Sequence, residues 1–444
     1  MDGVAMSIIT PRVLKGFRDF LPDTEMARKA LIEKLEKVFA SFGFVPIDTP
    51  VLEYAEILLG KGGGETDKQV YRFRDHGNRD VAMRFDLTVP FARFMAEHAD
   101  ELYLPFRRYH IAKVWRGENT QRGRYREFMQ CDFDIVGTDS ASADADILLT
   151  AASAMRALDV GEFKLRINHR MLFNRFLDRL GASEKSVEIL RTVDKREKIG
   201  DDATASMLAE LVSSEAAREI LEFIRQEKDF AATLDKMSAL CAPHDQAAMA
   251  ARTRLLEVME CVASAGYDAH VILDPSITRG LDYYTGIVLE TQLSELPEIG
   301  SVCSGGRYDE LASLYTTRKL PGVGASVGLD RLMAAMEALG SMRTAPHSTA
   351  ILVINQEVNT LAELHAVASK LRAQGIASEV YPENRKLAAQ YSYAERKHIP
   401  LALFVQPEHE ASRYLLRMLS RRENQGCDTL EAVCQVASRE LANA

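Results

Sequence analysis

The sequence predicts an α+β protein, in which an antiparallel sheet flanked by helices is followed by a separate α/β domain. Three observations support this prediction. Strand-like segments joined by hairpin-length loops dominate residues 44–136, as is typical of an antiparallel sheet. Ala, Leu, Glu and Lys dominate residues 170–264, which indicates a helical insertion. After residue 348 strand and helix alternate, which is typical of an α/β unit.

The first domain is expected to begin with a helix at Thr24–Phe42, where apolar residues recur at helical spacing. Asp23 or Thr24 can cap its start, and Gly43 can end it. Two strands are expected around a turn at His76–Asn78, followed by a short helix from Pro90. The other strands are expected at 44–53, 107–118, 127–136, 270–275 and 285–293, and a glycine-rich run at 322–328 enters a helix. In the second domain, strands are expected at 349–355, 376–382 and 400–407, and helices at 360–374 and 384–397.

Length and composition set limits on the class of protein. The 444 residues exceed what one hydrophobic core usually serves, so at least two domains are expected. Hydrophobic residues make up 47% and charged residues 27%, and no run of about 18 apolar residues is present to span a bilayer. The N-terminus lacks the basic and apolar regions of a secretion signal. We therefore expect a cytoplasmic protein with no membrane partner.

Charge and cysteine content exclude two further classes. The formal net charge of -9 disfavours non-specific coating of nucleic acid, because such binding needs a general excess of Lys and Arg. Local basic patches still allow a specific nucleic acid. The six cysteines form no CxxC pair and are spread along the chain, so neither a zinc site nor a disulfide framework is indicated.

Polar and apolar residues alternate along the expected strand at 127–136, so its two faces differ. One face carries Met129, Cys131, Phe133 and Ile135, and the other carries Gln130, Asp132 and Asp134. A half-buried strand with a solvated face explains this alternation by itself. The segment before it, however, carries seven basic residues against Glu118 and Glu127: Arg107, Arg108, Lys113, Arg116, Arg122, Arg124 and Arg126. The planar guanidinium of arginine presents several N–H donors that bind phosphate oxygens well, so a polyanion is predicted beside this strand.

Two glycine-containing stretches add further arginines. The run Pro321–Leu332 is a poor dinucleotide-binding fingerprint, because no clear strand precedes it and no βαβ unit surrounds it. A glycine strand that permits close helix packing explains its glycines but not Arg331, which falls in the first turn of the next helix. In "ITRGLDYYTG", Arg279 can stabilise negative charge but cannot act as a base. Its neighbours Tyr283 and Tyr284 suit closure over a planar polar ligand.

A structural arginine in a turn with two core tyrosines explains that last stretch equally well on its own. Arg116, Arg279 and Arg331, however, lie on three separate segments of one predicted sheet. Three arginines that meet at one sheet indicate a triphosphate.

Together these motifs resemble those of the histidyl-tRNA synthetases, over nearly the whole chain. Two stretches resemble the signature motifs of that family and three resemble the class II motifs 1, 2 and 3: "RGLDYYTG" and "SGGRYD", then "FGFVPIDTPVLE", "VWRGE…RGRYREFMQCDFDIVG" and "GASVGLDRL". "LKGFRDFLP" and "MRFDLTVPFARF" also match in order. The resemblance implies a class II synthetase-like antiparallel sheet in a catalytic domain at 1–345, and an α/β anticodon-binding domain at 346–444.

The resemblance also implies the reaction. L-histidine would be activated with ATP and Mg²⁺ to histidyl-adenylate, then transferred to the 3′ end of tRNA(His), by a homodimer with motif 1 at its interface. Arg116 and Arg279 would be catalytic, and no residue is assigned to the metal. The implied ATP-binding residues are Arg116, Glu118 and Arg331, and the implied histidine-binding residues are Asp86, Thr88, Arg116, Gln130, Asp134, Arg279, Tyr283 and Tyr284. Candidate RNA contacts are Arg385, Lys386, Arg396 and Lys397, although a solvated helix face explains any one of them.

The chain departs from the pattern of the family in three places. The motif 2 loop, "RGENTQRGR", is short, "DLT" resembles the eukaryotic form, and Asp330 stands where glutamate is commoner. Since that loop is where the family meets the acceptor end of tRNA, recognition of that end stays open. The alternative is a non-catalytic, histidine-sensing regulatory subunit of ATP phosphoribosyltransferase. Such a paralogue would be expected to lack the C-terminal domain and to have degraded ATP-binding motifs, whereas this chain keeps both.

Overall fold

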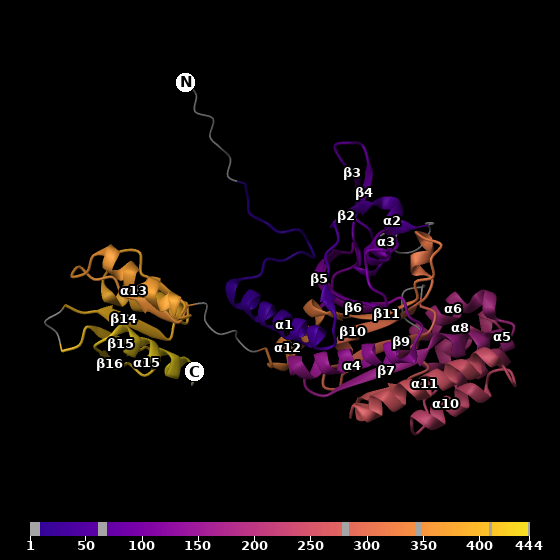
Figure 1. Cartoon of the computed structure of the whole chain (residues 1–444). Helices are drawn as coiled ribbons and strands as arrows, with labels where there is room; N and C mark the ends of the chain where they lie inside the picture. The colour runs from indigo at the N-terminus through magenta and orange to yellow at the C-terminus, as the bar shows by residue number, and fades with distance from the viewer. Residues whose placement is uncertain (1–8, 61–68, 278–283, 343–348, 408–410, 443–444) are drawn as a thin grey trace. The chain divides into compact units, whose positions relative to one another are not determined.

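The chain forms two compact units, Met1–Arg343 (unit 1) and Thr344–Ala444 (unit 2). A computed structural model describes residues 9–60, 69–277, 284–342, 349–407 and 411–442 (Figure 1). Among these residues, no helix has both the length and the apolar character required to cross a membrane.

Unit 1 is built on an eight-stranded sheet and a separate three-stranded sheet. Its strands are β1 (Val45–Pro46), β2 (Leu52–Tyr54), β3 (Arg72–Arg74), β4 (Asp80–Met83), β5 (Phe106–Trp115), β6 (Glu127–Val136), β7 (Phe163–His169), β8 (Val271–Leu273), β9 (Ile287–Leu293), β10 (Cys303–Tyr308) and β11 (Gly322–Gly328). Its helices are α1 (Pro22–Ser41), α2 (Ala55–Leu59), α3 (Thr88–His98), α4 (Ala141–Leu158), α5 (Arg170–Arg179), α6 (Ser186–Asp194), α7 (Arg196–Ile199), α8 (Asp201–Leu211), α9 (Ser214–Ile224), α10 (Phe230–Ala239), α11 (Gln246–Ser264) and α12 (Leu329–Leu339).

The large sheet is antiparallel through its centre, as the sequence predicts. Its strand order is β1-β5-β6-β11-β10-β9-β7-β8. Every neighbouring pair from β5 to β7 is antiparallel, and only the outer pairs β1–β5 and β7–β8 are parallel. Strands that are far apart in sequence, such as β6 and β11, therefore lie side by side.

One face of this sheet packs on helices and forms the main core. The predicted apolar face of β6 is buried there, with Cys131, Phe133 and Ile135 at most 1% exposed. The ring of Phe133 lies 5.0 Å from that of Phe39 on α1, and α4 contributes Met155 to the same cluster. Because the apolar side chains of β6 hold the helices, its polar side chains face the opposite side of the sheet.

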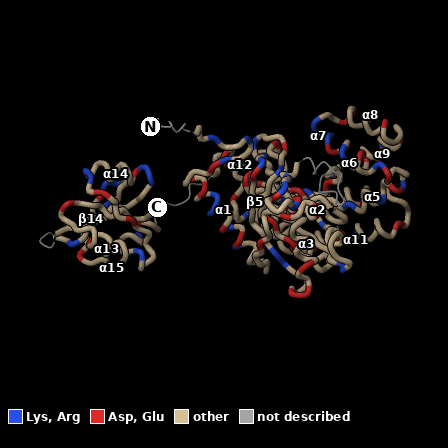
Figure 2. Tube along the Cα trace, turned by 90° about the horizontal axis from the view of Figure 1, so that it is seen from above, with Lys and Arg blue, Asp and Glu red and all other residues tan. Residues whose placement is uncertain are grey.

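The helices between β7 and β8 occupy 170–264, in the region where the sequence predicts an insertion. Both views of unit 1 place α5, α6 and α8 on the side away from α1 (Figures 1 and 2). Arg175 on α5 joins Asp245, the N-cap of α11, with 2.7 Å between Nε and Oδ2. This contact connects the two ends of the helical segment.

Two predicted helix starts differ from those observed. Helix α1 begins at Pro22 after Leu21, which makes no side-chain cap, so capping by Asp23 or Thr24 was a wrong prediction. Proline suits the first helical position because its fixed φ matches the helix and its missing N–H has no partner there. Helix α3 likewise begins at Thr88, before Pro90, because Oδ1 of Asp86 accepts the N–H of Val89 at 3.0 Å.

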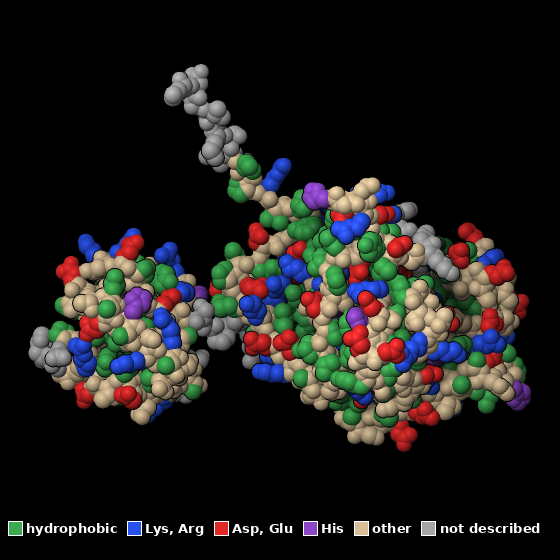
Figure 3. Space-filling model, turned by 45° about the horizontal axis from the view of Figure 1, so that its top comes forward, with side chains coloured by type: hydrophobic (Ala, Val, Ile, Leu, Met, Phe, Trp, Pro, Cys, Tyr) green, Lys and Arg blue, Asp and Glu red, His purple; other side chains and the backbone are tan. Residues whose placement is uncertain are grey.

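The three-stranded sheet has the order β2-β4-β3 and leaves apolar side chains exposed. Tyr54 and Phe73 both pair with Val81 on the central strand, so all three side chains share one face. Tyr54 is 52% exposed and Phe73 is 46% exposed, and Leu52 on the same face is 44% exposed. Figure 3 shows hydrophobic side chains on the side of unit 1 that carries this sheet.

Unit 2 is a five-stranded sheet with helices on both faces. It contains β12 (Ile351–Val353), β13 (Ser378–Val380), β14 (Leu401–Val405), β15 (Tyr414–Met418), β16 (Glu423–Cys427), α13 (Leu361–Ala373), α14 (Leu387–Arg396) and α15 (Leu430–Ala442). The predicted strand-helix alternation is found in β12, β13 and β14, which pair in parallel. The antiparallel hairpin β15–β16 was not predicted. Leu364 of α13 and Val433 of α15 share one core cluster, whereas Ala394 of α14 lies in another.

Candidate active site

A cavity of about 370 Å³ lies on the polar side of the large sheet. Eight of the predicted site residues line it: Asp86, Thr88, Arg116, Glu118, Gln130, Asp134, Tyr284 and Arg331. The other two, Arg279 and Tyr283, lie outside the described residues. The fold thus brings together side chains from five separate segments of the chain, and a cavity of this size suits a small-molecule ligand.

Strand register builds the floor of the cavity. Three rows of paired residues cross it from β5 through β6 to β11: Arg108, Asp134 and Gly324; His110, Asp132 and Ser326; and Ala112, Gln130 and Gly328. Paired residues of neighbouring strands project from the same face, so each row is a fixed set of neighbours. The two aspartates and the glutamine follow each other about 7 Å apart along β6.

Asp134 is held at one end of this floor by two side chains that the sequence did not assign to the site. Arg108 is fully buried, and its Nη2 lies 2.8 Å from Oδ2 of Asp134. The hydroxyl of Tyr308 donates a hydrogen bond to Oδ1 of Asp134. Burial raises the pKa of Asp134, while Arg108 and Tyr308 oppose that rise. The contacts leave Asp134 with one orientation.

Several basic residues of the β5–β6 hairpin form ion pairs within the protein. Arg108 is buried against Asp134, Arg107 pairs with Asp146, and Lys113 pairs with Glu127. Alternation along β5 turns Arg107 and Lys113 to the face of the sheet opposite that of Arg108. Arg116 and Arg124, which lie beyond the paired region of the two strands, do line the cavity.

The alternating glycines of β11 make room for the cavity side chains. A Cβ at Gly324 would lie 1.9 Å from Oδ1 of Asp134, and a Cβ at Gly322 would lie 2.5 Å from Cε2 of Tyr308. Gly306 on β10 acts in the same way, because its Cβ would lie 2.9 Å from Cδ1 of Tyr284. The glycine strand is present as the sequence suggested, but these glycines accommodate a carboxylate and two tyrosine rings rather than a helix.

The opposite part of the floor has oxygen atoms without partners. Asp86 is 1% exposed, and its Oδ2 has no hydrogen-bond partner among the described residues. Burial raises the pKa of Asp86. Gln130 donates from Nε2 to Oγ of Ser326 at 3.2 Å, while its Oε1 finds no partner in the described part of the chain. Since buried polar atoms are normally hydrogen-bonded, these oxygens indicate acceptors that await a ligand.

Arginines gather at another part of the cavity. Arg116 donates from Nε to the carbonyl of Phe85 at 2.8 Å, and Arg331 donates from Nη1 to the carbonyl of Ser301 at 2.6 Å. Each keeps further guanidinium donors for a ligand. Burial lowers the pKa of Arg331, and nearby Arg124 adds to this effect. Clustered cations in a partly buried cavity are suited to a polyphosphate.

Asp330 fixes the helix that carries Arg331. Its Oδ2 accepts the N–H of Met129 on β6 at 2.6 Å, and its Oδ1 pairs with Arg18. The guanidinium carbon of Arg18 in turn lies 3.9 Å from the ring centre of Tyr125. The aspartate therefore ties the start of α12 to the strand that forms the floor.

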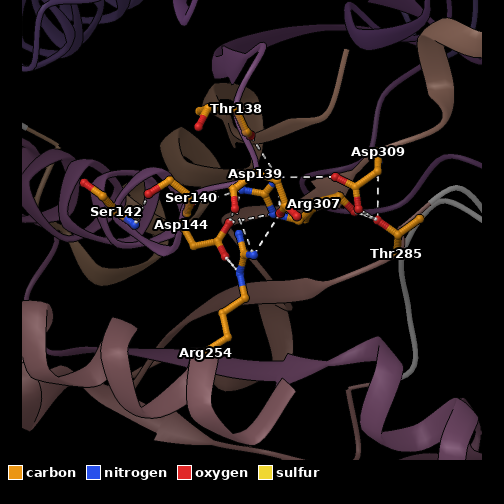
Figure 4. Close-up of polar contacts among 9 residues, drawn as sticks. All are labelled: Thr138, Asp139, Ser140, Ser142, Asp144, Arg254, Thr285, Arg307 and Asp309. Carbon is orange, nitrogen blue, oxygen red and sulfur yellow. Dashed lines mark hydrogen bonds and ion pairs between the residues drawn. The ribbon is translucent and has the colours of Figure 1, made fainter. Parts of the chain in front are cut away.

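A buried ion network supports the strand that carries Tyr308 (Figure 4). Arg307 donates from Nε and Nη2 to Oδ1 of Asp144 on α4, at 2.9 and 2.7 Å. Arg254 on α11 donates to the other oxygen of Asp144 at 2.6 Å. The carbonyl of Arg307 accepts the N–H of Thr285 at 2.8 Å. Thr285 follows Tyr284, so the network connects a cavity residue to the helical segment.

Comparison with solved structures defines the class of protein. The histidyl-tRNA synthetase from Nostoc sp. PCC 7120 superposes with a TM-score of 0.87 at 30% identity, over 98% of this chain and 100% of that one. The architecture is therefore that of a class II aminoacyl-tRNA synthetase.

Sequence comparison gives the family. The model for "Histidyl-tRNA synthetase" matches residues 16–332, and the model for "Anticodon binding domain" matches residues 349–436. The histidine–tRNA ligase of Treponema denticola is 52% identical over 404 residues, which cover 90% of this chain and 89% of that protein. The chain belongs to the histidyl-tRNA synthetase family. It is an aminoacyl-tRNA synthetase, and its function is that of a histidine–tRNA ligase.

The regulatory alternative has less support. A structure described as an ATP phosphoribosyltransferase regulatory subunit/histidyl-tRNA synthetase, from Bacillus halodurans C, superposes with a TM-score of 0.73. It covers 87% of this chain and 97% of that one at 23% identity, and a likeness at that level shows the fold alone.

Substituting Gly324→Ala should weaken histidine binding, because the new Cβ would displace the carboxylate of Asp134. Overpacking of this kind typically costs about 1–3 kcal/mol, so the KM for histidine should rise roughly 10- to 100-fold. Gly328→Ala is the matched control on the same strand face, since its Cβ would lie 3.8 Å from the nearest atom. Both variants are compared by histidine-dependent ATP/pyrophosphate exchange. Equal KM values for the two variants would show that the space at Gly324 has no role.

Removing the charge of Arg254 should also raise the KM for histidine, by loosening Arg307 and Thr285 behind Tyr284. We expect roughly a 3- to 10-fold effect for Arg254→Met, with the KM for ATP nearly unchanged. The control is Arg252→Met on the same helix, where the lost ion pair with Asp235 is 40% and 65% exposed and contributes little. If both variants have the same KM for histidine, the network does not position the cavity.

Proposed function

We propose that this cavity activates L-histidine with ATP and then transfers histidine to the 3′ end of tRNA(His). The observation that carries the proposal is the shared cavity, which has carboxylates and an amide at its floor and arginines nearby. In the first step, a carboxylate oxygen of histidine attacks the α-phosphorus of ATP. A bond from that phosphorus to oxygen breaks, and pyrophosphate leaves. In the second step, a ribose hydroxyl of the tRNA attacks the carbonyl carbon, loses its proton and displaces AMP.

The acidic floor is proposed to bind histidine. Asp86, Thr88 and Gln130 would bind the amino group, and the free oxygens of Asp86 and Gln130 support this role. Asp134, Tyr283 and Tyr284 would surround the imidazole. The hydrogen bond from Tyr308 and the ion pair with Arg108 support the role of Asp134, because they hold one carboxylate in a fixed orientation for a ring nitrogen.

The arginines are proposed to bind ATP. Arg116 would meet the α-phosphate and the histidine carboxylate, Arg331 the distal phosphates, and Glu118 the adenine end. Arg279 would stabilise the charge that develops at the α-phosphate. No general base is needed in the first step, since a carboxylate is already a nucleophile. The cavity therefore acts by positioning the reactants and neutralising phosphate charge.

Mg²⁺ is proposed to enter with ATP as part of the substrate. The described residues include no group of three or more His, Cys, Asp and Glu that could hold a metal ion by themselves. Magnesium typically takes one or two carboxylates together with substrate phosphates. Glu290 lines the cavity and is a carboxylate close to Arg331.

A homodimer is proposed to form through motif 1. The exposed apolar face of β2-β4-β3 supports the proposal, because it includes Leu52 of that motif, together with Tyr54 and Phe73. An exposed apolar patch on an otherwise polar surface is typical of an interface.

Unit 1 is proposed to be the catalytic domain, and unit 2 the domain that binds the anticodon of tRNA(His), in a cytoplasmic enzyme. Figure 2 shows basic residues beside α14 of unit 2. Arg385 pairs with Glu383, and Lys397 with Glu379. The other two candidates, Lys386 and Arg396, are exposed and so are favoured as RNA contacts.

The assignment of Arg279 is tested by ATP/pyrophosphate exchange across the amino acids. Histidine alone should drive exchange in the wild-type protein. Arg279→Ala should lower the rate roughly 100- to 1000-fold while the circular dichroism spectrum stays unchanged, because electrostatic stabilisers act on the transition state. A near-normal rate would remove Arg279 from the mechanism.

The roles of the two units are tested by truncation after Pro346. The shortened protein should retain histidine-dependent exchange, because unit 1 holds the whole cavity. Its charging of tRNA(His) should fall strongly. Loss of exchange and of charging to the same extent would contradict a separate anticodon-binding role for unit 2.

A further inference from the structure

The middle residue of the cavity floor, Asp132, has no role in the reaction described so far. It projects from β6 between Gln130 and Asp134 and lines the cavity. It is 2% exposed, so its carboxylate has lost nearly all contact with bulk solvent. A buried charge of this kind is costly unless it is paired.

The neighbours of Asp132 do not pair fully with it. Nη2 of Arg108 lies 3.9 Å from Oδ2 of Asp132 but only 2.8 Å from Asp134, so that guanidinium belongs mainly to Asp134. His110 lies opposite in the strand register, yet its Nε2 is 3.0 Å from Oδ1 of Asp48. Burial lowers the pKa of His110 to about 4, which leaves the ring neutral at neutral pH.

The surrounding charge is negative. Asp86, Asp132 and Asp134 are each at most 3% exposed, whereas Arg108 is the buried cation that faces the last two. Arg84, the other buried arginine nearby, donates to the carbonyl of Thr49 at 2.6 Å. Burial raises the pKa of Asp132 to about 7, and the charges of Asp134 and Asp86 add to that rise. Arg116 also carries positive charge near Asp86, yet the contacts of the described residues give neither Asp86 nor Asp132 a close ion pair.

The free acceptors match one cationic group. Within the described residues, four buried oxygens of the cavity lining have no hydrogen-bond partner. One of them, Oδ2 of Asp134, forms an ion pair with Arg108, which leaves Oδ2 of Asp86, Oε1 of Gln130 and Oδ1 of Asp132. An ammonium group has three N–H donors and one positive charge. Two carboxylate oxygens and one amide oxygen would accept hydrogen bonds from all three donors, and the positive charge of the ammonium group would offset the charge of the two aspartates.

We propose that Asp132 binds the α-ammonium group of the histidine substrate, together with Asp86 and Gln130. The inference rests on the proposed function and adds to it a further residue that determines specificity. Asp132 makes the pocket select an amino acid by its positive charge as well as by its ring. Along β6, the ammonium group would then bind at Gln130 and Asp132, and the imidazole ring would bind at Asp134.

A dependence on pH follows, with a definite sign. The carboxylate of Asp132 is charged above its pKa and loses its charge as the pH falls through about 7. Binding of an ammonium needs the charged form, so the KM for histidine should rise as the pH falls. The imidazole of histidine also titrates near 6.5, so the comparison is between wild type and a variant at each pH.

The test uses Asp132→Asn in the full-length protein and two inhibitors of histidine-dependent exchange. Histidinol keeps the ammonium group, and 3-(imidazol-4-yl)propionate lacks it. The variant should bind histidine and histidinol roughly 10- to 100-fold more weakly, because a hydrogen bond to a charged group typically contributes that much to binding. Imidazolylpropionate should bind no more weakly than before. The extra rise in KM at low pH should disappear.

Asp134→Asn is the matched control. It should weaken the binding of both inhibitors, because both carry the imidazole ring that Asp134 is proposed to bind. If Asp132→Asn weakens the binding of histidinol and imidazolylpropionate equally, Asp132 lies at the imidazole or has a purely structural role. That result would overturn the proposal. Unchanged histidine binding would overturn it as well. If Asp132→Asn does not fold, Asp132→Ser replaces it in the same comparison. Wild-type protein without histidine-dependent exchange would overturn the proposed function itself, whereas wild-type exchange with an unaffected variant would overturn only the role of Asp132.

Discussion

The register between β6 and β11 is the constraint on which the site depends. It places Asp134 beside Gly324 and Asp132 beside Ser326. A slip of one residue would turn every side chain of β6 to the other face. The core prevents such a slip, because Cys131, Phe133 and Ile135 are buried against the helices. The apolar face of the strand therefore determines where the polar face points.

With that register, glycines on β10 and β11 leave space for the side chains that line the cavity. Gly322, Gly324 and Gly306 leave the space in which Asp134, Tyr308 and Tyr284 lie. Asp86 and Asp132 are buried with oxygens that lack partners in the described part of the chain. Such groups destabilise a protein that has no ligand, and they strengthen contacts with a ligand that supplies the missing donors. The cavity exchanges some stability of the unbound protein for selective binding.

The sequence predicted some residues of this cavity and missed others, and the difference has a physical cause. Alternation has a period of two residues and is a local property, so it identified the polar face of β6 without knowledge of the fold. Motif resemblance then gathered side chains from distant segments. Neither reveals which strands become neighbours. The contact of Tyr308 with Asp134 joins residues 174 positions apart and exists only because β10, β11 and β6 are adjacent. The burial of Arg108 was missed for the same reason.

The two ends of the cavity are supported from different parts of unit 1. At the arginine end, Asp330 ties α12 to β6 and pairs with Arg18, so the support comes from the sheet and the N-terminal segment. At the tyrosine end, Arg307 and Asp144 connect Thr285 to Arg254 on α11. The two sets of contacts share no residue, although both act on the strands that form the cavity floor. The helical segment between β7 and β8 thus acts on the amino-acid end of the cavity, through a buried carboxylate that neither substrate touches.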